Sequence, residues 1–361
     1  MKIHFVLPFS GRKPVGGFKV VYEYANELSD RGHEVLITHT AGLYLGVNPN
    51  DRVHINLAKF FIFGMLKNYL PTKWFKLNPK VKTRWVPSLH PIFIPDSDVV
   101  VATSWETAEW ISPLAPAKGK KIYLIQHLED WIASSDRVFE TWKSIKNKVV
   151  ISKWLMQIAN DLGEEVAYVP NGLDFSAFSI DIAPESREPQ SILMLYHEQP
   201  FKGTVHGLNA IALVRQHFPD IRVTLFGATK PPLNFLPSWA NFVLRPSPER
   251  LRALYNQNAI FVSPSLSEGW ALPPAEAMQC GCATVLTKIG GHEYAIDNKT
   301  SLLSTPSDDE LMAGNIVRLL EDQSLRINLA KNSAQEMSQY TWRRATDGLL
   351  SAMENGQSQA A

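Results

Sequence analysis

Glu268 and Glu276 are the two residues of this chain whose type and spacing most clearly suggest chemistry. Residues 259–263 form a short apolar run that predicts a buried strand. The proline pair at residues 273–274 predicts the start of a helix, because proline lacks the N–H group that a helix interior needs. Gly281 predicts the end of that helix. We therefore expect Glu268 in a loop and Glu276 in the first turn of the following helix.

These residue types suit the binding of a nucleotide. A helix N-terminus presents free backbone N–H groups and the positive end of the helix dipole, and both attract a phosphate. A carboxylate beside it can accept hydrogen bonds from the two hydroxyls of a ribose. The alternative is structural: a solvated Glu268, and a Glu276 that interacts only with the helix dipole.

Residues 268–276, Glu-Gly-Trp-Ala-Leu-Pro-Pro-Ala-Glu, resemble the E-x7-E signature of retaining, nucleotide-sugar-dependent glycosyltransferases of family 4. Residues 281–293 resemble the small-residue turn, buried strand and Gly-Gly-x-x-Glu loop of that family. The resemblance implies an α/β protein with the GT-B architecture, in which two Rossmann-like, doubly wound domains face each other across a cleft. It also implies a nucleotide-diphosphate sugar as co-substrate, with no metal and no other cofactor.

The resemblance assigns roles within this signature. In the family, the first glutamate contacts the donor sugar and the second binds the ribose, which implies these roles for Glu268 and Glu276. The loop amides after the first glutamate hold the diphosphate, and here they belong to Gly269, Trp270, Ala271 and Leu272. Ala271 departs from the family pattern, in which glycine is usual, and it adds a methyl group close to the expected phosphate.

A predicted strand at residues 191–196 leads into a loop that carries further charges. Members of the family have an arginine here and, five residues later, a lysine that neutralises the diphosphate. Lys202 matches the lysine, whereas His197 stands where the arginine is expected. Histidine is only fractionally charged near neutral pH and cannot bind two oxygens side by side as arginine does. We therefore expect Lys202 and the helix N-terminus to stabilise the leaving diphosphate.

Two features of the N-terminal half also resemble the family. Gly16 and Gly17 precede a predicted helix at residues 18–31 and resemble a Gly-Gly loop that is held against the donor phosphates. The alternative for this glycine pair is a plain tight turn. His127 follows the predicted strand 121–126 and matches a histidine near the donor sugar and the acceptor, so we include it among the catalytic candidates. A core or surface histidine is its alternative.

Two other short segments complete the candidate sites. Leu244 and Arg245 follow a predicted strand at the place where the resemblance implies the nucleobase. The Asp-Ser-Asp triplet at residues 96–98 resembles the metal-binding motif of a different glycosyltransferase class. Because it directly precedes the apolar run 99–103, we interpret it as the turn before a buried strand.

Residues 52–95 contain no Asp or Glu and mix basic with aromatic side chains. The basic residues are Arg52, Lys59, Lys67, Lys73, Lys76, Lys80, Lys82 and Arg84, and the aromatic ones include Phe60, Phe61, Phe63, Tyr69, Trp74, Phe75 and Trp85. This composition suits an anionic membrane surface or a phosphate-bearing acceptor. A solvated basic face around an irregular insertion explains it equally well.

The length of 361 residues predicts two domains. We place an N-terminal, acceptor-side domain at residues 1–180 and a C-terminal, nucleotide-sugar-binding domain at residues 181–338. A polar, proline-bearing stretch at residues 180–190 predicts the linker. Residues 339–361 are expected to form a terminal helix that crosses back to the first domain, followed by a tail.

The overall composition excludes several classes of protein. A formal net charge of +1 does not indicate a nucleic-acid partner. Cys280 and Cys282 are too few for a zinc site and are poorly spaced for a disulfide, which favours a reducing compartment. No apolar run approaches the length of a membrane span. We expect a cytoplasmic protein that can also bind peripherally to the inner face of the plasma membrane.

Together these features predict a metal-independent, retaining, hexosyl-type glycosyltransferase that acts on a glycan or lipid-linked acceptor in cell-envelope polysaccharide synthesis. One alternative is a non-hydrolysing sugar-nucleotide epimerase, which shares the two-domain architecture. The other is a non-catalytic subunit that binds a nucleotide or a glycan, which His197 and Ala271 favour.

Overall fold

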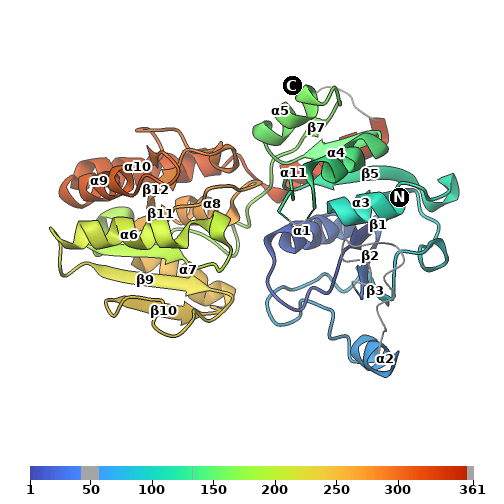
Figure 1. Ribbon diagram of the computed structural model, residues 1–361, viewed down its shortest axis with the longest axis horizontal. Coiled ribbons are helices and arrows are strands. Elements are labelled where there is room, and N and C mark those ends of the chain that lie inside the picture. The colour runs from blue at the N-terminus through green and yellow to red at the C-terminus, as the bar shows by residue number, and fades with distance from the viewer. Residues whose placement is uncertain (42–56, 132, 356–361) are drawn as a thin grey trace. The chain divides into compact units, whose positions relative to one another are not determined.

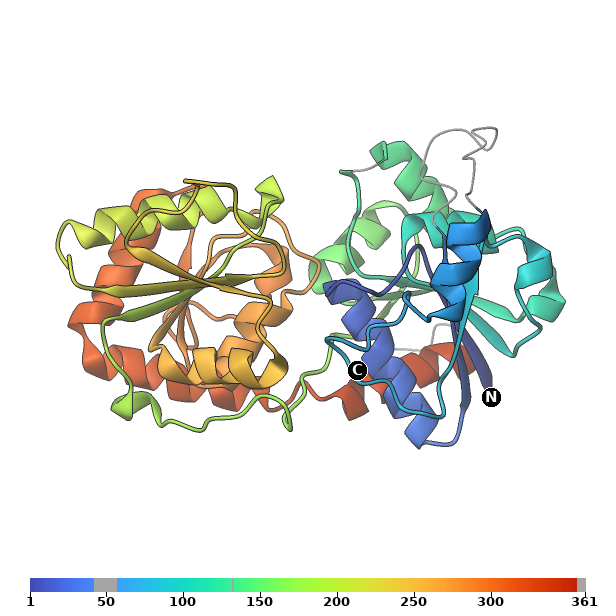
Figure 2. The same cartoon turned by 90° about the horizontal axis from the view of Figure 1, so that it is seen from below.

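The computed structural model describes residues 1–41, 57–131 and 133–355, which form two compact units (Figures 1 and 2). Unit 1 runs from Met1 to Asn171 and also includes the terminal segment that begins at Trp342. Unit 2 is Gly172–Thr341. Each unit is an α/β structure around one parallel sheet, and each is described separately.

Unit 1 contains a seven-stranded sheet with the order β3-β2-β1-β4-β5-β6-β7. Its strands are β1 (Lys2–Leu7), β2 (Glu34–Thr40), β3 (Lys82–Val86), β4 (Val99–Ala102), β5 (Lys120–Ile125), β6 (Asn147–Val150) and β7 (Ala167–Tyr168). Its helices are α1 (Gly16–Asp30), α2 (Leu57–Met65), α3 (Trp105–Ile111), α4 (Ser135–Ser144), α5 (Lys153–Asp161) and α11 (Trp342–Asn355), with 3-10 turns η1 (Pro91–Phe93) and η2 (Pro116–Lys118). The terminal helix α11 packs on α1 and β6.

Unit 2 contains a six-stranded sheet with the order β10-β9-β8-β11-β12-β13. Its strands are β8 (Ser191–Leu195), β9 (Arg222–Gly227), β10 (Ala240–Leu244), β11 (Ile260–Ser263), β12 (Ala283–Thr287) and β13 (Leu302–Ser304). Its helices are α6 (Thr204–Arg215), α7 (Pro248–Gln257), α8 (Leu272–Gln279), α9 (Asp309–Glu321) and α10 (Gln323–Met337), with 3-10 turns η3 (Pro184–Ser186), η4 (Pro200–Lys202) and η5 (Gly290–His292).

The sheet of unit 2 is apolar on both faces because helices cover both. One core cluster joins the strands to α6, α9 and α10, and includes Ile211, Ile316 and Leu329. A second cluster joins them to α7 and α8 and includes Tyr255 and Ala277. Strands buried in this way read as continuous apolar runs, which is why the sequence predicted most of them.

The strand order of unit 2 reverses between β8 and β11, which are neighbours in the sheet. In open parallel sheets, the loops that leave the carboxyl ends at such a reversal diverge and leave room for a ligand. Here these are the loop after β8, with η4, and the loop that joins β11 to α8. The fold therefore brings two chain segments, far apart in sequence, to one edge of the sheet.

The divisions between the units lie at residues 171/172 and 341/342, whereas the sequence placed them at 180/181 and 338/339. The stretch 180–190, predicted as a linker, packs into unit 2 through Arg187, which is only 6% exposed. Its guanidinium donates hydrogen bonds to the carbonyl oxygens of Ile182, Tyr255, Asn258 and Cys280. Three of these carbonyls lie at the ends of α7 and α8, where a positive charge is favourable.

Two local predictions need correction. Helix α1 begins at Gly16, so Gly16 and Gly17 form its first turn instead of a loop before it. Glu276 lies in the second turn of α8, since the first turn contains no acidic residue. Helix α1 has no capping side chain that would mark its start in the sequence. Helix α8 begins at Leu272, one residue before the proline pair, so Glu276 is its fifth residue.

Within the described residues, none of the helices is both long and apolar enough to cross a membrane.

The carbonyl contacts of Arg187 lead to a prediction about stability. Arg187→Met keeps much of the apolar volume but leaves several buried carbonyl oxygens without a donor. We expect the free energy of unfolding, measured in urea, to fall by about 3 kcal/mol. Lys331→Ala, which removes an exposed ion pair with Glu185, is the control and should change the unfolding midpoint little. Equal effects of the two variants would contradict this role for Arg187.

Candidate functional site

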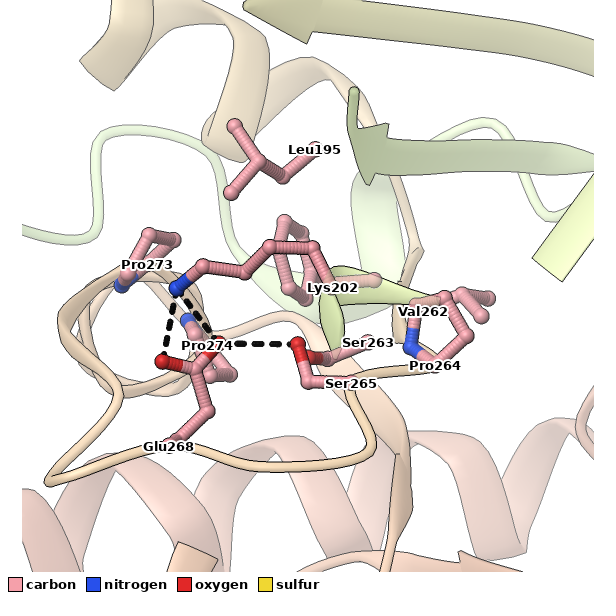
Figure 3. A pocket seen from close by; sticks show the side chains of 10 residues that line it. Leu195, Lys202, Val262, Ser263, Pro264, Ser265, Glu268, Pro273 and Pro274 are labelled. Atoms are coloured by element: carbon pink, nitrogen blue, oxygen red, sulfur yellow. Dashed lines mark hydrogen bonds and ion pairs between the residues drawn. The ribbon is translucent and has the colours of Figure 1, made fainter. Parts of the chain in front are cut away.

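The candidate site is a pocket at the carboxyl ends of β8 and β11 in unit 2 (Figure 3). Its lining comes from β8, η4, β11, the loop after β11 and the start of α8. The lining residues are Leu195, Lys202, Phe261, Val262, Ser263, Pro264, Ser265, Glu268, Pro273 and Pro274. Two predicted residues, Lys202 and Glu268, thus lie in one pocket.

Lys202 and Glu268 form a two-pronged ion pair in this pocket. The Lys202 Nζ atom lies 2.8 Å from Oε1 and 2.7 Å from Oε2 of Glu268, and the Ser265 hydroxyl donates to Oε1 at 2.8 Å (Figure 3). Burial alone would raise the pKa of Glu268, but the charge and hydrogen bonds of Lys202 outweigh burial and lower it. Glu268 is therefore a carboxylate at neutral pH.

The position of Lys202 depends on the glycine that follows it. Gly203 has φ +65°, a left-handed conformation, and joins η4 to α6. A Cβ atom at Gly203 would lie 2.0 Å from the carbonyl oxygen of Pro264. The loop after β8 can therefore approach the loop after β11 only with glycine here. Gly207 in α6 fits as closely, since its Cβ would lie 2.3 Å from the sulfur of Met194.

The backbone around Glu268 is held by the loop that contains η5. A Cβ atom at Gly291 would lie 2.3 Å from the Cβ of Glu268 and 2.5 Å from its carbonyl oxygen. The amide of Ala271 donates to the carbonyl of Gly291 at 3.0 Å, and the Tyr294 hydroxyl donates to the carbonyl of Ala271 at 2.7 Å. The η5 loop therefore holds the backbone of Glu268 and of the residues that follow it in place.

These contacts bear on the loop amides predicted to hold a diphosphate. The amide of Ala271 is used within the protein, so it does not serve that role in this structure. Trp270 is buried, with its ring 4.7 Å from that of Tyr294. Leu272 is the first residue of α8, and Gly269 precedes it in the loop.

Glu276 lies deeper in unit 2 and is 5% exposed. The hydroxyl of Tyr255 donates to its Oε2 atom at 3.2 Å. Burial and then the nearby Glu276 charge raise the pKa of Tyr255 well above its usual value, so the tyrosine remains a hydrogen-bond donor. Glu276 is not among the residues that line the pocket of Figure 3.

His197 contributes no fixed positive charge. It follows β8, and its Nδ1 atom accepts a hydrogen bond from the amide of Gln199 at 3.1 Å. Burial, and next the charge of Lys202, lower the pKa of His197, so it is neutral at neutral pH. Lys202 is thus the cation of this loop, residues 196–203.

Leu244 and Arg245 lie at the end of the edge strand β10. Arg245 has φ +47°, and its amide and Nε groups donate to the carbonyl oxygens of Gly227 and Ala228 at 2.8 and 2.7 Å. Leu244 is exposed. These contacts fix the loop after β10 against the end of β9.

Three of the predicted donor-site or catalytic residues lie in unit 1, namely Gly16, Gly17 and His127. Gly17 is near the side chain of Gln126, since its Cβ would lie 3.3 Å from that amide oxygen, whereas a Cβ at Gly16 would meet open space. His127 lies shortly after the end of β5, with its ring 4.6 Å from that of Trp131. The amide of Leu128 donates to its Nδ1 atom. All three are therefore near the carboxyl ends of the strands of their own sheet or the start of α1.

Sequence reasoning did not identify Ser265 and His292, which lie near the ion pair of Lys202 and Glu268. Ser265 lies three residues before Glu268, and no pattern distinguishes it from other loop serines. His292 is buried, with its Nδ1 atom 2.8 Å from the carbonyl oxygen of Thr287 and its Nε2 atom 3.4 Å from the Ser263 hydroxyl. Its place after Gly290 and Gly291 was the available signal.

The region that contains this pocket matches a known family model. Residues 192–322 match the family model described as "Glycosyl transferases group 1". The chain is 23% identical to a phosphatidyl-myo-inositol mannosyltransferase of Mycolicibacterium smegmatis, over 95% of this chain and 90% of the relative. It is 38% identical to an N,N'-diacetylbacillosaminyl-diphospho-undecaprenol alpha-1,3-N-acetylgalactosaminyltransferase of Campylobacter jejuni, over 30% of this chain and 29% of the relative.

Among solved structures, the chain resembles Anabaena Alr3699/HepE in complex with UDP and glucose. The TM-score is 0.74 at 17% identity, over 98% of this chain and 100% of that chain. This likeness and the two parallel sheets confirm the predicted fold, a GT-B architecture built from two Rossmann-like units.

The close approach at Gly203 leads to a second prediction. Gly203→Ala places a methyl group against the Pro264 carbonyl and forces alanine into a left-handed conformation. We expect the free energy of unfolding to fall by at least about 2 kcal/mol. Gly314→Ala is the matched control, because Gly314 lies in α9 and its Cβ would meet nothing within 4 Å. That variant should be neutral or stabilising. The constraint is absent if both variants unfold like the wild type in urea.

Proposed function

We propose that this protein is a retaining glycosyltransferase that moves a hexosyl group from a nucleotide-diphosphate sugar to a glycan or lipid-linked acceptor. The comparisons support glycosyl transfer as the class of function that the sequence predicted. The observation that carries the proposal is the meeting of Lys202 and Glu268 in one pocket, inside the segment that matches the family model.

The proposed roles follow from the chemistry of each group. Lys202 neutralises the charge that grows on the leaving diphosphate, and the amides of the loop at 269–272 other than that of Ala271 assist it. Glu268 accepts hydrogen bonds from hydroxyls of the donor sugar, and Glu276 from the ribose. We propose that neither a metal nor another cofactor takes part. Gly16, Gly17, His127, His197, Leu244 and Arg245 remain predicted contacts.

The acceptor is proposed to carry a lipid. The names of two relatives include phosphatidyl-myo-inositol and diphospho-undecaprenol, which are lipid structures. The UDP and glucose bound to a structural neighbour make UDP-sugars reasonable first donors to test. We propose synthesis of cell-envelope polysaccharide at the cytoplasmic face of the membrane as the setting.

The structure describes residues 57–95 of the basic segment, and the packing of their aromatic rings differs from the prediction. Several of its aromatic rings pack inside unit 1: Tyr69 is 4% exposed, and Trp74 donates its indole N–H to the carbonyl of Gly11. Trp85 stacks on Tyr69. Tyr69 is therefore buried, whereas Trp74 and Trp85 are half-buried against the protein. Arg52 lies outside the described residues.

Helix α2 provides an exposed apolar surface instead. It lies beside the edge strand β3 (Figure 1), and Phe60 and Phe63 pack on Trp85. Its exposed residues are Phe61, Ile62 and Met65, with Leu66 directly after the helix. The exposed basic residues nearby in sequence are Lys67, Lys73, Lys76, Lys80, Lys82 and Arg84. We propose that these apolar and basic residues bind an anionic bilayer.

The donor assignment is tested with purified protein and the pairs UDP with UDP-glucose and GDP with GDP-mannose. Glu276→Ala should weaken binding of the free nucleotide by roughly 10- to 150-fold, since charged hydrogen bonds contribute roughly 1.5–3 kcal/mol. Lys202→Ala should lower turnover more than Lys202→Arg does. Glu321→Ala, an exposed glutamate at the end of α9, is the control. Equal nucleotide affinity in the wild type and Glu276→Ala would contradict the ribose assignment.

Product analysis separates the proposal from its alternatives. Transfer with the donor's anomeric configuration preserved, as measured by NMR of the product, supports retention. Conversion of one nucleotide sugar into another without an acceptor would instead identify an epimerase. Nucleotide binding without hydrolysis or transfer would identify a non-catalytic subunit.

Membrane binding is tested by sedimentation with vesicles that contain phosphatidylglycerol. Reversing the charges of Lys73, Lys76, Lys80 and Lys82 to glutamate should abolish sedimentation at low salt but leave donor hydrolysis intact. Binding of the wild type should weaken as salt increases, because exposed charges are screened. The control reverses four exposed lysines of unit 2: Lys230, Lys288, Lys299 and Lys331. If the wild type does not sediment with these vesicles at low salt, this surface does not bind a membrane.

A further inference from the structure

The ion pair between Lys202 and Glu268 joins two groups that the proposed function assigns to different parts of one ligand. Lys202 is assigned to the diphosphate and Glu268 to the sugar. We infer that Glu268 makes the protein discriminate against a nucleoside diphosphate that lacks its sugar. A diphosphate draws Lys202 away from Glu268, and sugar hydroxyls are then needed to satisfy the buried carboxylate. This inference rests on the proposed function.

Glu268 and Lys202 differ in how freely their side chains can move. Glu268 is held by the Ser265 hydroxyl and by the close packing of its backbone on Gly291. Lys202 is attached through four methylene groups, and its side chain is 20% exposed, against 10% for Glu268. When a competing anion enters the pocket, Lys202 can move while Glu268 stays in place.

The other titratable groups near this pair carry no positive charge at neutral pH. His197 and His292 both have a lowered pKa, mainly because they are buried, so both are neutral at neutral pH. Tyr294, whose pKa is raised by burial and then by Glu268, stays protonated. Among the pocket-lining residues in the described part of the chain, Lys202 is the cation. A diphosphate and Glu268 therefore compete for the same positive charge.

Glu268 loses its cation when a diphosphate binds Lys202. A buried carboxylate without a cation is strongly unfavourable, because it has lost its hydration and gained no equivalent partner. Ser265 remains as one donor, but a hydroxyl group does not replace a full charge. The hydroxyls of a donor sugar supply further hydrogen bonds to the carboxylate. A nucleotide sugar can therefore satisfy both Lys202 and Glu268, whereas the bare diphosphate satisfies only Lys202.

This arrangement also affects the end of the reaction. When the sugar leaves for the acceptor, the diphosphate remains with Lys202, and Glu268 loses its hydroxyl partners. The return of Lys202 to Glu268 then favours release of the product. The pair thus serves both the choice of ligand and product release.

The test compares dissociation constants for UDP and UDP-glucose, and for GDP and GDP-mannose, by calorimetry. Glu268→Gln removes the charge but keeps the size of the side chain. Relative to the wild type, it should bind the bare diphosphate more tightly and the nucleotide sugar more weakly. We expect the ratio of the two constants to change by about tenfold, the scale of a single charged hydrogen bond.

Two further variants test whether the discrimination comes from the carboxylate of Glu268. Ser265→Ala removes the neutral donor, so the unpaired carboxylate costs more and the discrimination should increase. Glu276→Gln should weaken both ligands of a pair alike and leave their ratio unchanged. Circular dichroism confirms that each variant is folded.

The outcomes separate this inference from the function on which it rests. If the wild type binds neither member of either pair, both the proposed donor and the inference fail. If a pair binds and Glu268→Gln leaves the ratio unchanged, the inference fails while the donor assignment stands. Opposite changes in Glu268→Gln and Ser265→Ala support the inference.

Discussion

The site depends on the close contact between the loops that follow β8 and β11. Gly203 lies directly against the carbonyl of Pro264, a contact that leaves no space for any side chain. This contact brings Lys202, at the end of η4, within reach of Glu268, which is far away in the sequence. The parallel order of β8 and β11 supplies the two neighbouring loops, and glycine allows them to touch.

Each buried charge of unit 2 also needs a compensating partner, and unit 2 provides partners of two kinds. Glu268 is compensated by a flexible lysine, so its partner can change when a ligand arrives. Arg187 is compensated by carbonyl oxygens at the ends of helices, which are fixed parts of the fold. The first arrangement suits a binding site because it can be rearranged at small structural cost. The second suits a structural role because rearranging it would expose the ends of α7 and α8.

The sequence predicted the parts of the fold that depend on apolar runs and on special backbone residues. The buried strands, the proline-initiated helix α8 and its end at Gly281 follow from local rules. The start of α1 did not, because no side chain caps that helix. Glu276 falls in the second turn of α8 because the helix already begins at Leu272, before the prolines. Within the site, Lys202 and Glu268 could be named from a resemblance. Their direct pairing could not, since it depends on contact between distant loops.

The segment 57–95 shows why composition alone is a poor guide to a surface. Its aromatic residues are interleaved with lysines, yet Tyr69, Trp74 and Trp85 face the interior of unit 1, where they contact each other or the backbone. Flexible lysine side chains reach solvent from positions next to buried rings, so alternation along the chain does not imply a shared face. The apolar residues that do face outward lie on α2, at the edge of the sheet beyond β3. There an apolar stripe and an acid-free basic stretch adjoin in sequence, which is the combination that an anionic lipid surface requires.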